Sequence, residues 1–157
     1  MGAFASLPAD PARTVLDAAP DATLCAPRGA VTCRVRRQPH VLLVEDDAGI
    51  RGATRLLLKV AGYRVTDAGC VAEAAALARE HEALDVLITD DYLGNLDTGL
   101  DAIAAVRAAH GRHLAAVVVA DDRARLMMEF ECDSNTHIAA TPIIADEFLA
   151  LLAALLG

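Results

Sequence analysis

The sequence predicts an α/β fold in which a central parallel sheet is covered by helices on both faces. Three observations support this prediction. The chain has 157 residues, which suits a single domain. Hydrophobic residues make up 55% of it and charged residues 23%, so a packed core is readily filled. From residue 40 onward, short apolar runs alternate with segments of helical spacing, and such alternation requires parallel strands joined by right-handed crossovers.

Residues 1–38 differ from the rest in composition. They hold four of the six prolines and are rich in alanine, so we expect an N-terminal tail or linker. Within them, apolar and polar residues alternate over 29–37, which is typical of a short half-buried strand. The folded domain is therefore expected to span residues 39–157.

The first strand and helix of this domain have clear boundaries. The continuous apolar run at 41–44 suits a strand that is buried on both faces. A helix is predicted over 48–61, with Asp47 as its N-cap and Gly62 just beyond its end. The apolar residues with helical spacing, which we expect to face inward, are Ile50, Ala53, Leu57 and Val60.

The middle of the domain repeats the same alternation. Residues 63–66 are predicted to form a short strand, and 71–81 an alanine-rich helix with an inward side of Val71, Ala74 and Ala78. A second buried strand is predicted over 86–89. A loop rich in glycine, asparagine and aspartate at 94–97 then leads to a helix over 99–109, whose inward residues are Leu100, Ile103 and Val106.

The last elements complete the alternation. Residues 115–119 are predicted to form a strand, 123–131 a weak helix and 138–140 a thin last strand. The final helix spans 145–156, with an inward side of Phe148, Leu151, Leu152 and Leu155. We therefore expect a flavodoxin-like, doubly wound (βα)5 sandwich with a five-stranded parallel sheet in the order 2-1-3-4-5.

Composition argues against several classes of protein. The net charge of -8 and the pI near 4.9 disfavour a nucleic-acid-binding surface, which needs clustered lysine and arginine. No apolar run approaches the ~18 residues of a membrane span, and no basic segment followed by an apolar run indicates export. We expect a cytoplasmic protein that binds neither nucleic acid nor membrane.

Neither cysteine nor histidine spacing suggests a zinc site or a disulfide framework. The cysteines are scattered and are expected to be buried or partly buried thiols in a reducing compartment: Cys25, Cys33, Cys70 and Cys132. The histidines fall on predicted edges and loops and are expected to be exposed: His40, His81, His110, His113 and His137.

Acidic side chains follow two of the predicted buried strands. The first strand ends in Glu45-Asp46-Asp47 and the third ends in Asp90-Asp91. In the order 2-1-3-4-5 these strands are neighbours, so the carboxylates would share the edge of the sheet where ligands bind. Oxygen ligands in such a cluster suit Mg²⁺. The alternative is that Asp47 caps a helix and the other acids simply line the rim of the sheet.

Common catalytic motifs are absent from the sequence. There is no G-x-x-x-x-G-K-[ST] and no G-x-G-x-x-G, which disfavours a P-loop NTPase and a dinucleotide-binding fold. A phosphatase of the haloacid dehalogenase type needs Asp-x-Asp after its buried strand, but Tyr92 stands at the second of these positions. No general acid or base is evident, so we expect that the protein is not an enzyme.

These residues resemble the receiver domain of two-component response regulators, most closely the receivers of hybrid histidine kinases. The similarity spans about residues 40–156. The segment 41–51, Val-Leu-Leu-Val-Glu-Asp-Asp-Ala-Gly-Ile-Arg, resembles the family's first strand with its acidic pair and the arginine that follows. The segment 85–90, Asp-Val-Leu-Ile-Thr-Asp, resembles the strand that carries the phosphorylated aspartate, and Tyr92-Leu-Gly with Thr98-Gly99 continues the pattern.

The resemblance implies a role for each acid. Asp90 would be the phospho-acceptor, and Glu45 and Asp46 would hold Mg²⁺ together with Asp90 and the backbone carbonyl of Tyr92. The phosphoryl donor would be a histidine kinase or a phosphotransfer protein, and a homodimer would form through the last strand and the last helix. Residues 28–36 also resemble the strand that closes a histidine-kinase ATP-binding domain, so the tail is either a kinase remnant or an unstructured leader.

The sequence departs from the family where the phosphoryl group is read. The family has a hydroxyl residue at the end of the fourth strand, where this chain has Ala120, and a lysine before a proline at the end of the fifth, where it has Thr141. Ile138 stands where many members have an aromatic residue that rotates. Two functions therefore remain open: a phospho-accepting receiver in a phosphorelay, and a pseudo-receiver that acts as a phosphorylation-independent interaction module.

Overall fold

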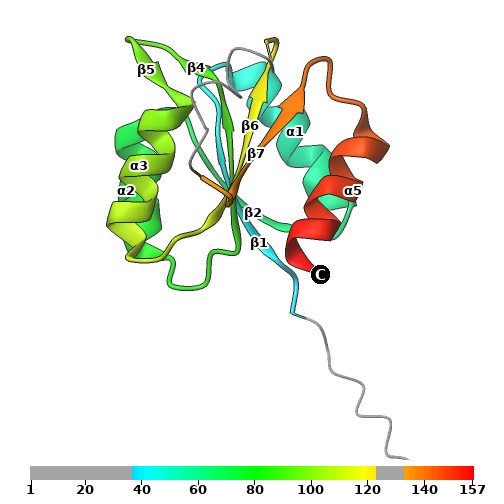
Figure 1. The fold of residues 1–157 in the computed structure, drawn as a ribbon, viewed down its shortest axis with the longest axis horizontal. Helices are drawn as coiled ribbons and strands as arrows, with labels where there is room; N and C mark the ends of the chain where they lie inside the picture. The colour runs from blue at the N-terminus through cyan, green and yellow to red at the C-terminus, as the bar shows by residue number, and fades with distance from the viewer. Residues whose placement is uncertain (1–36, 123–132) are drawn as a thin grey trace, which may run out of the picture. The chain divides into compact units, whose positions relative to one another are not determined.

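The structure, a computed structural model, describes residues 37–122 and 133–157. Five parallel strands form one sheet in the order β2-β1-β3-β6-β7, which confirms the predicted order 2-1-3-4-5 (Figure 1). The strands are β1 (His40–Val44), β2 (Arg64–Ala68), β3 (Val86–Asp90), β6 (Ala115–Ala120) and β7 (Thr136–Ala140). The flavodoxin-like architecture is thus confirmed.

Four helices of the described chain cover the two faces of the sheet. They are α1 (Ala48–Val60), α2 (Val71–Glu80), α3 (Gly99–His110) and α5 (Ala145–Leu156). Figure 1 shows α2 and α3 on one face and α1 and α5 on the other. Among the described helices, none combines the length and the apolar character that a membrane span requires. The tail predicted over 1–38, its short strand and the helix predicted over 123–131 lie outside the described residues, apart from the last residues of the tail.

The sheet separates two apolar cores. Every residue of β1 is buried, and so are the first four of β3, as expected for strands that are covered on both faces. Alternate side chains point to opposite faces, so Leu42 and Leu87 pack toward α2 and α3, while Val41 and Ile88 belong to the core that contains Phe148 of α5. The two central strands are therefore held in place from both sides.

The predicted inward face of α1 is wrong at Ile50, Ala53 and Val60 and correct at Leu57. Ile50 and Val60 were expected to be buried, but they are 55% and 80% exposed, and Ala53 is exposed as well. The helix instead buries Leu58 completely, with Leu57 partly buried beside it. Apolar residues surround the C-terminal half of α1, so helical spacing fits more than one face, and only the packing against the sheet selects Leu58.

A small hairpin lies between β3 and α3, where only a loop was expected. Strand β4 (Tyr92–Leu93) pairs antiparallel with β5 (Asp97–Thr98), and Asn95 and Leu96 at the turn both have positive φ, 61° and 71°. Asparagine tolerates this left-handed region better than most residues, which favours a tight turn here. The hairpin brings its own backbone close to the end of β1.

His40 is buried, which corrects the expectation that all histidines are exposed. His81, His110 and His137 are partly buried as well, and His113 is exposed as predicted. His40 begins strand β1, which lies between β2 and β3, and is 1% exposed. Its Nδ1 lies 2.6 Å from Nη2 of Arg64, and its Nε2 lies 2.8 Å from Oγ1 of Thr66. A guanidinium only donates, so Nδ1 accepts and the ring is neutral with its hydrogen on Nε2. Burial, and then the charge of Arg64, lower the pKa of His40.

Cys70, the cysteine that the described residues contain, is exposed at the N-cap of α2, although we expected a buried or partly buried thiol. The other three cysteines lie outside the described residues.

Two leucines of α1 test the revised packing of that helix. Leu58→Ala should lower the free energy of unfolding by about 2–5 kcal/mol, because it leaves a cavity in a closed core. Leu56→Ala removes the same atoms from a side chain that is 64% exposed and should change stability by about 0.5 kcal/mol or less. Urea unfolding of both variants measures the difference. Equal losses would contradict the burial of Leu58.

Candidate metal centre

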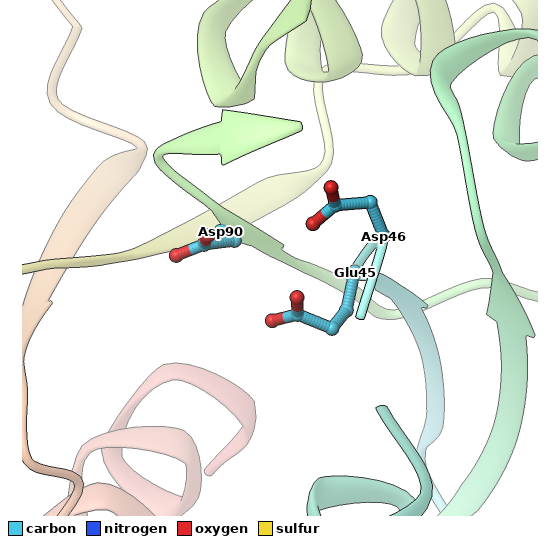
Figure 2. Close-up of side chains that lie close together, drawn as sticks. All are labelled: Glu45, Asp46 and Asp90. Atoms are coloured by element: carbon cyan, nitrogen blue, oxygen red, sulfur yellow. The ribbon is translucent and has the colours of Figure 1, made fainter. Parts of the chain in front are cut away.

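Three carboxylates converge at the C-terminal edge of the sheet. Strands β1 and β3 are parallel neighbours with Val44 beside Thr89, so the residues that follow them meet at one place. One carboxylate oxygen each from Glu45, Asp46 and Asp90 lies within 4.8 Å of the other two. Figure 2 shows Glu45 and Asp46, from the end of β1, beside Asp90 of β3. The predicted convergence of acids from two strand ends is confirmed.

The other two acids of the predicted edge have different surroundings. Asp47 caps α1, because its Oδ1 accepts hydrogen bonds from the backbone N–H groups of Gly49 and Ile50 at 2.8 and 2.9 Å. Asp91 is buried, and its N–H donates to the carbonyl of Val119 at 3.0 Å. The helix-cap alternative thus holds for Asp47, while the remaining three acids form a cluster.

Backbone groups orient two of the carboxylates. The N–H of Asp47 donates to Oε1 of Glu45 at 3.1 Å, and the N–H of Gly94 in the β4–β5 turn donates to Oδ2 of Asp46 at 3.1 Å. Arg51 of α1 donates to the backbone carbonyls of Glu45 and Asp46. Within residues 37–122 and 133–157, no lysine or arginine forms an ion pair with these three carboxylates. In this part of the chain, the nearby arginines of α1 pair with Asp67 and not with the cluster.

Burial and mutual repulsion perturb the cluster. The pKa of Glu45 is raised to about 7, chiefly by burial; the charges of Asp90 and Asp46 add to this, and the hydrogen bond from Asp47 opposes it. The pKa of Asp90 is raised as well, chiefly by burial, with the charges of Asp46, Asp91 and Asp121 acting in the same direction. A divalent cation relieves this repulsion, and oxygen ligands in a partly exposed cluster suit Mg²⁺.

Close packing against α3 places the backbone of Asp90. A Cβ on Gly99, the first residue of that helix, would lie 2.5 Å from the carbonyl oxygen of Asp90, so only glycine fits here. The same carbonyl accepts a hydrogen bond from the buried hydroxyl of Thr89 at 3.0 Å. The N–H of Gly99 donates to the carbonyl of Asp91 at 2.9 Å. In the sequence, Gly99 stands out only as part of the Thr98-Gly99 pair.

Tyr92 lies in strand β4 of the hairpin, and its side chain is 64% exposed. The role of its backbone carbonyl as a metal ligand stays a prediction.

The residues at the three divergent positions lie at the ends of β6 and β7. Ala120 is buried, and its carbonyl accepts a hydrogen bond from the N–H of Thr141 at 3.1 Å. Thr141 lines a cavity of about 270 Å³ together with Glu45 and Asp90, but its hydroxyl donates to the carboxylate of Asp121. Ile138 is half-buried in β7. We did not expect Asp121 at the site. The sequence does contain an indication of it, because Asp121 directly follows a third buried strand.

A comparison with known protein families gave a match over most of the described domain. A family model described as response regulator receiver domain matches residues 41–138, which is more than half of the chain. No curated protein sequence gave a significant match.

Solved structures share the fold. The chemotaxis protein CheY4 of Vibrio cholerae is 25% identical with a TM-score of 0.67, over 76% of this chain and 99% of that one. A response regulator receiver protein from Sinorhizobium medicae is 19% identical with a TM-score of 0.66, over 76% and 95%. The receiver domain of a sensor histidine kinase from Pseudomonas aeruginosa, with a magnesium ion coordinated in its active site cleft, is 24% identical with a TM-score of 0.65, over 76% and 98%.

Two glycines test the packing around Asp90. Gly99→Ala should lower the free energy of unfolding by about 1–3 kcal/mol, because the added methyl group collides with the backbone of Asp90. Gly52→Ala, in the middle of α1 with no atom within 4 Å of the added carbon, should raise it by about 0.5–1 kcal/mol through helix propensity. Chemical denaturation measures both, and a stabilised Gly99→Ala variant would refute the close approach.

Glu45 should make stability depend on pH when metal is removed by a chelator. Its pKa rises from 4.5 to about 7 on folding, so stability is lost as pH increases through this range. Glu45→Gln should therefore raise the free energy of unfolding by about 1–3 kcal/mol at pH 8, and the gain should shrink toward pH 5. The same exchange at the exposed Glu82 is the control, expected within about 0.5 kcal/mol at both pH values. If the gain in unfolding free energy of Glu45→Gln did not vary with pH, the raised pKa of Glu45 would be contradicted.

Proposed function

This chain belongs to the family of response regulator receiver domains of two-component signalling, and we propose that it accepts a phosphoryl group on Asp90 with Mg²⁺ bound beside it, as one step of a phosphorelay. The observation that carries this proposal is the convergence of Glu45, Asp46 and Asp90 at one edge of the sheet. The carboxylates fit the ion, since they are oxygen ligands from two neighbouring strands and lack a protein cation among the described residues.

The proposed chemistry uses Asp90 as the nucleophile. A carboxylate oxygen of Asp90 attacks the phosphorus of a phosphohistidine; the new O–P bond forms as the P–N bond breaks, and the imidazole leaves with the bonding electrons. Glu45 and Asp46 would hold Mg²⁺, which offsets the charge of the phosphoryl oxygens when it is bound. Gly99 and Thr89 hold the backbone of Asp90, so the attacking oxygen is kept at the edge of the sheet.

The donor in this proposal is a histidine kinase or a phosphotransfer protein, because both present a phosphohistidine. The chain then acts as a cytoplasmic phosphoryl acceptor and not as an enzyme that turns over a small substrate. We also propose that the chain forms a homodimer through β7 and α5. A groove of about 460 Å³, which Ile138, Ile143 and Phe148 help to line, supports this proposal.

A second function has an observation of its own. At the ends of β6 and β7, Ala120 offers only a methyl group, and the hydroxyl of Thr141 already donates to Asp121. In this arrangement neither side chain donates toward Asp90. This favours a pseudo-receiver, a module that binds its partner without phosphorylation.

Labelling by acetyl phosphate separates the two functions. We expect the wild type to gain the mass of one phosphoryl group only when Mg²⁺ is present, and Asp90→Asn to remain unlabelled. Asp146→Asn, in the first turn of α5, should label like the wild type. The rate should be about 10²–10³-fold below that of a receiver with both phosphoryl donors, since removal of one fixed donor from an active site typically has that effect. A folded wild type that binds Mg²⁺ but is never labelled would support the pseudo-receiver.

A further inference from the structure

The side chain of Arg51 connects three parts of the chain next to the acidic cluster. Its Nη1 donates to the carbonyl oxygen of Glu45 at 2.6 Å and to that of Asp46 at 3.2 Å. Its Nε lies 3.5 Å from Oδ2 of Asp67, which belongs to the neighbouring strand β2. The side chain is only 23% exposed. One guanidinium therefore ties the turn that follows β1 to the edge of β2.

These contacts act on the two peptide groups that set the direction of the acidic side chains. The carbonyl oxygens of Glu45 and Asp46 belong to two successive peptide groups. Both accept a hydrogen bond from the same nitrogen of Arg51, so this side chain holds the orientation of both groups. The N–H of Glu45 donates to the carbonyl of Ala68 at 3.1 Å and holds the preceding peptide group, so the Cα–Cβ bonds of Glu45 and Asp46 are both fixed at the end of β1. The side chain of Asp47 caps the helical end of the same turn, and its N–H donates to the carboxylate of Glu45, but these hydrogen bonds do not involve the two carbonyls.

We propose that Arg51 is the positioning residue of the cation site: it holds the Glu45–Asp46 turn so that both carboxylates face Asp90. The inference rests on the proposed function, because it assumes that Glu45, Asp46 and Asp90 bind Mg²⁺. Arg51 does not touch the ion in this assignment and acts only through the backbone.

Charge alone gives the opposite expectation for this residue. A cation close to a cation site repels the ion, so an electrostatic role would make Arg51 weaken Mg²⁺ binding. Removal of Arg51 would then tighten binding. Removal of a positioning residue loosens it, and loss of such an outer partner typically costs 10–100-fold in metal affinity. The sign of the change therefore distinguishes the two roles.

The helix provides a matched control in Arg55. Its Nη1 lies 3.4 Å from Oδ1 of the same Asp67, and its side chain is 46% exposed. It carries the same charge on the same helix and shares the partner of Arg51, whereas the contacts to the carbonyls of Glu45 and Asp46 belong to Arg51. In variants of Arg51, Arg55 still pairs with Asp67, so that carboxylate is not left alone.

The test is a Mg²⁺ titration of the full chain, followed by the amide resonance of Gly94, whose N–H donates to Asp46. We expect Arg51→Gln to weaken binding about 10-fold and Arg51→Lys, which keeps the charge, to weaken it at least threefold. Arg55→Gln should bind within about twofold of the wild type or more tightly. Urea unfolding of each variant shows that a loss of affinity is not a loss of fold, and Arg51→Lys carries the test if Arg51→Gln does not fold.

Two outcomes would overturn the proposal in different ways. If the wild type binds Mg²⁺ and both Arg51 variants bind as tightly as Arg55→Gln, Arg51 does not position the site and the proposed function stands. If the folded wild type shows no Mg²⁺-dependent change, the proposed function fails and the role of Arg51 fails with it.

Discussion

Repulsion among the three carboxylates is the constraint on which the rest of the site depends. Folding brings Glu45, Asp46 and Asp90 together at the end of a buried sheet, and both desolvation and like charge oppose this. The cost is met by apolar packing elsewhere, because β1 and β3 are buried on both faces and cannot separate without opening two cores. The stable sheet thus holds the acidic side chains close together, although in water their repulsion would keep them apart.

Short-range contacts then convert this proximity into a defined geometry. Gly99 allows α3 to approach the backbone of Asp90, Gly94 donates to Asp46, and Asp47 both caps α1 and donates to Glu45. Gly94 and Asp47 act on the carboxylates through their backbone N–H groups, and Gly99 acts by having no side chain that would collide with the backbone of Asp90. Backbone groups add no positive charge to the cluster, so they can order the carboxylates without occupying the place of a cation.

The sequence predicts the parts of this arrangement that follow from strand order. Parallel strands place their C-terminal residues at one edge, so acids after two central strands had to meet, and Glu45, Asp46 and Asp90 do. It does not predict which face of α1 is buried, because apolar residues around that helix fit several faces and the choice falls on Leu58. Nor does it predict that His40 is buried, since its partners Arg64 and Thr66 come from another strand. Contacts between elements need coordinates, whereas the order of elements does not.

The acidic cluster and the positions that diverge from the family belong to different strands of this fold. The carboxylates and the contacts that order them come from β1, β3, α1 and the hairpin, while Ala120, Asp121 and Thr141 follow β6 and β7. The contacts described above that order the three carboxylates therefore involve neither Ala120 nor Thr141. Under the proposed function, the side chain of Ala120 would supply no donor to a phosphoryl group on Asp90. The negative charge of Asp121 also raises the pKa of Asp90. Under the proposed function, such a chain would keep its ion site while its response to phosphorylation became weak, because the two properties would have separate structural supports.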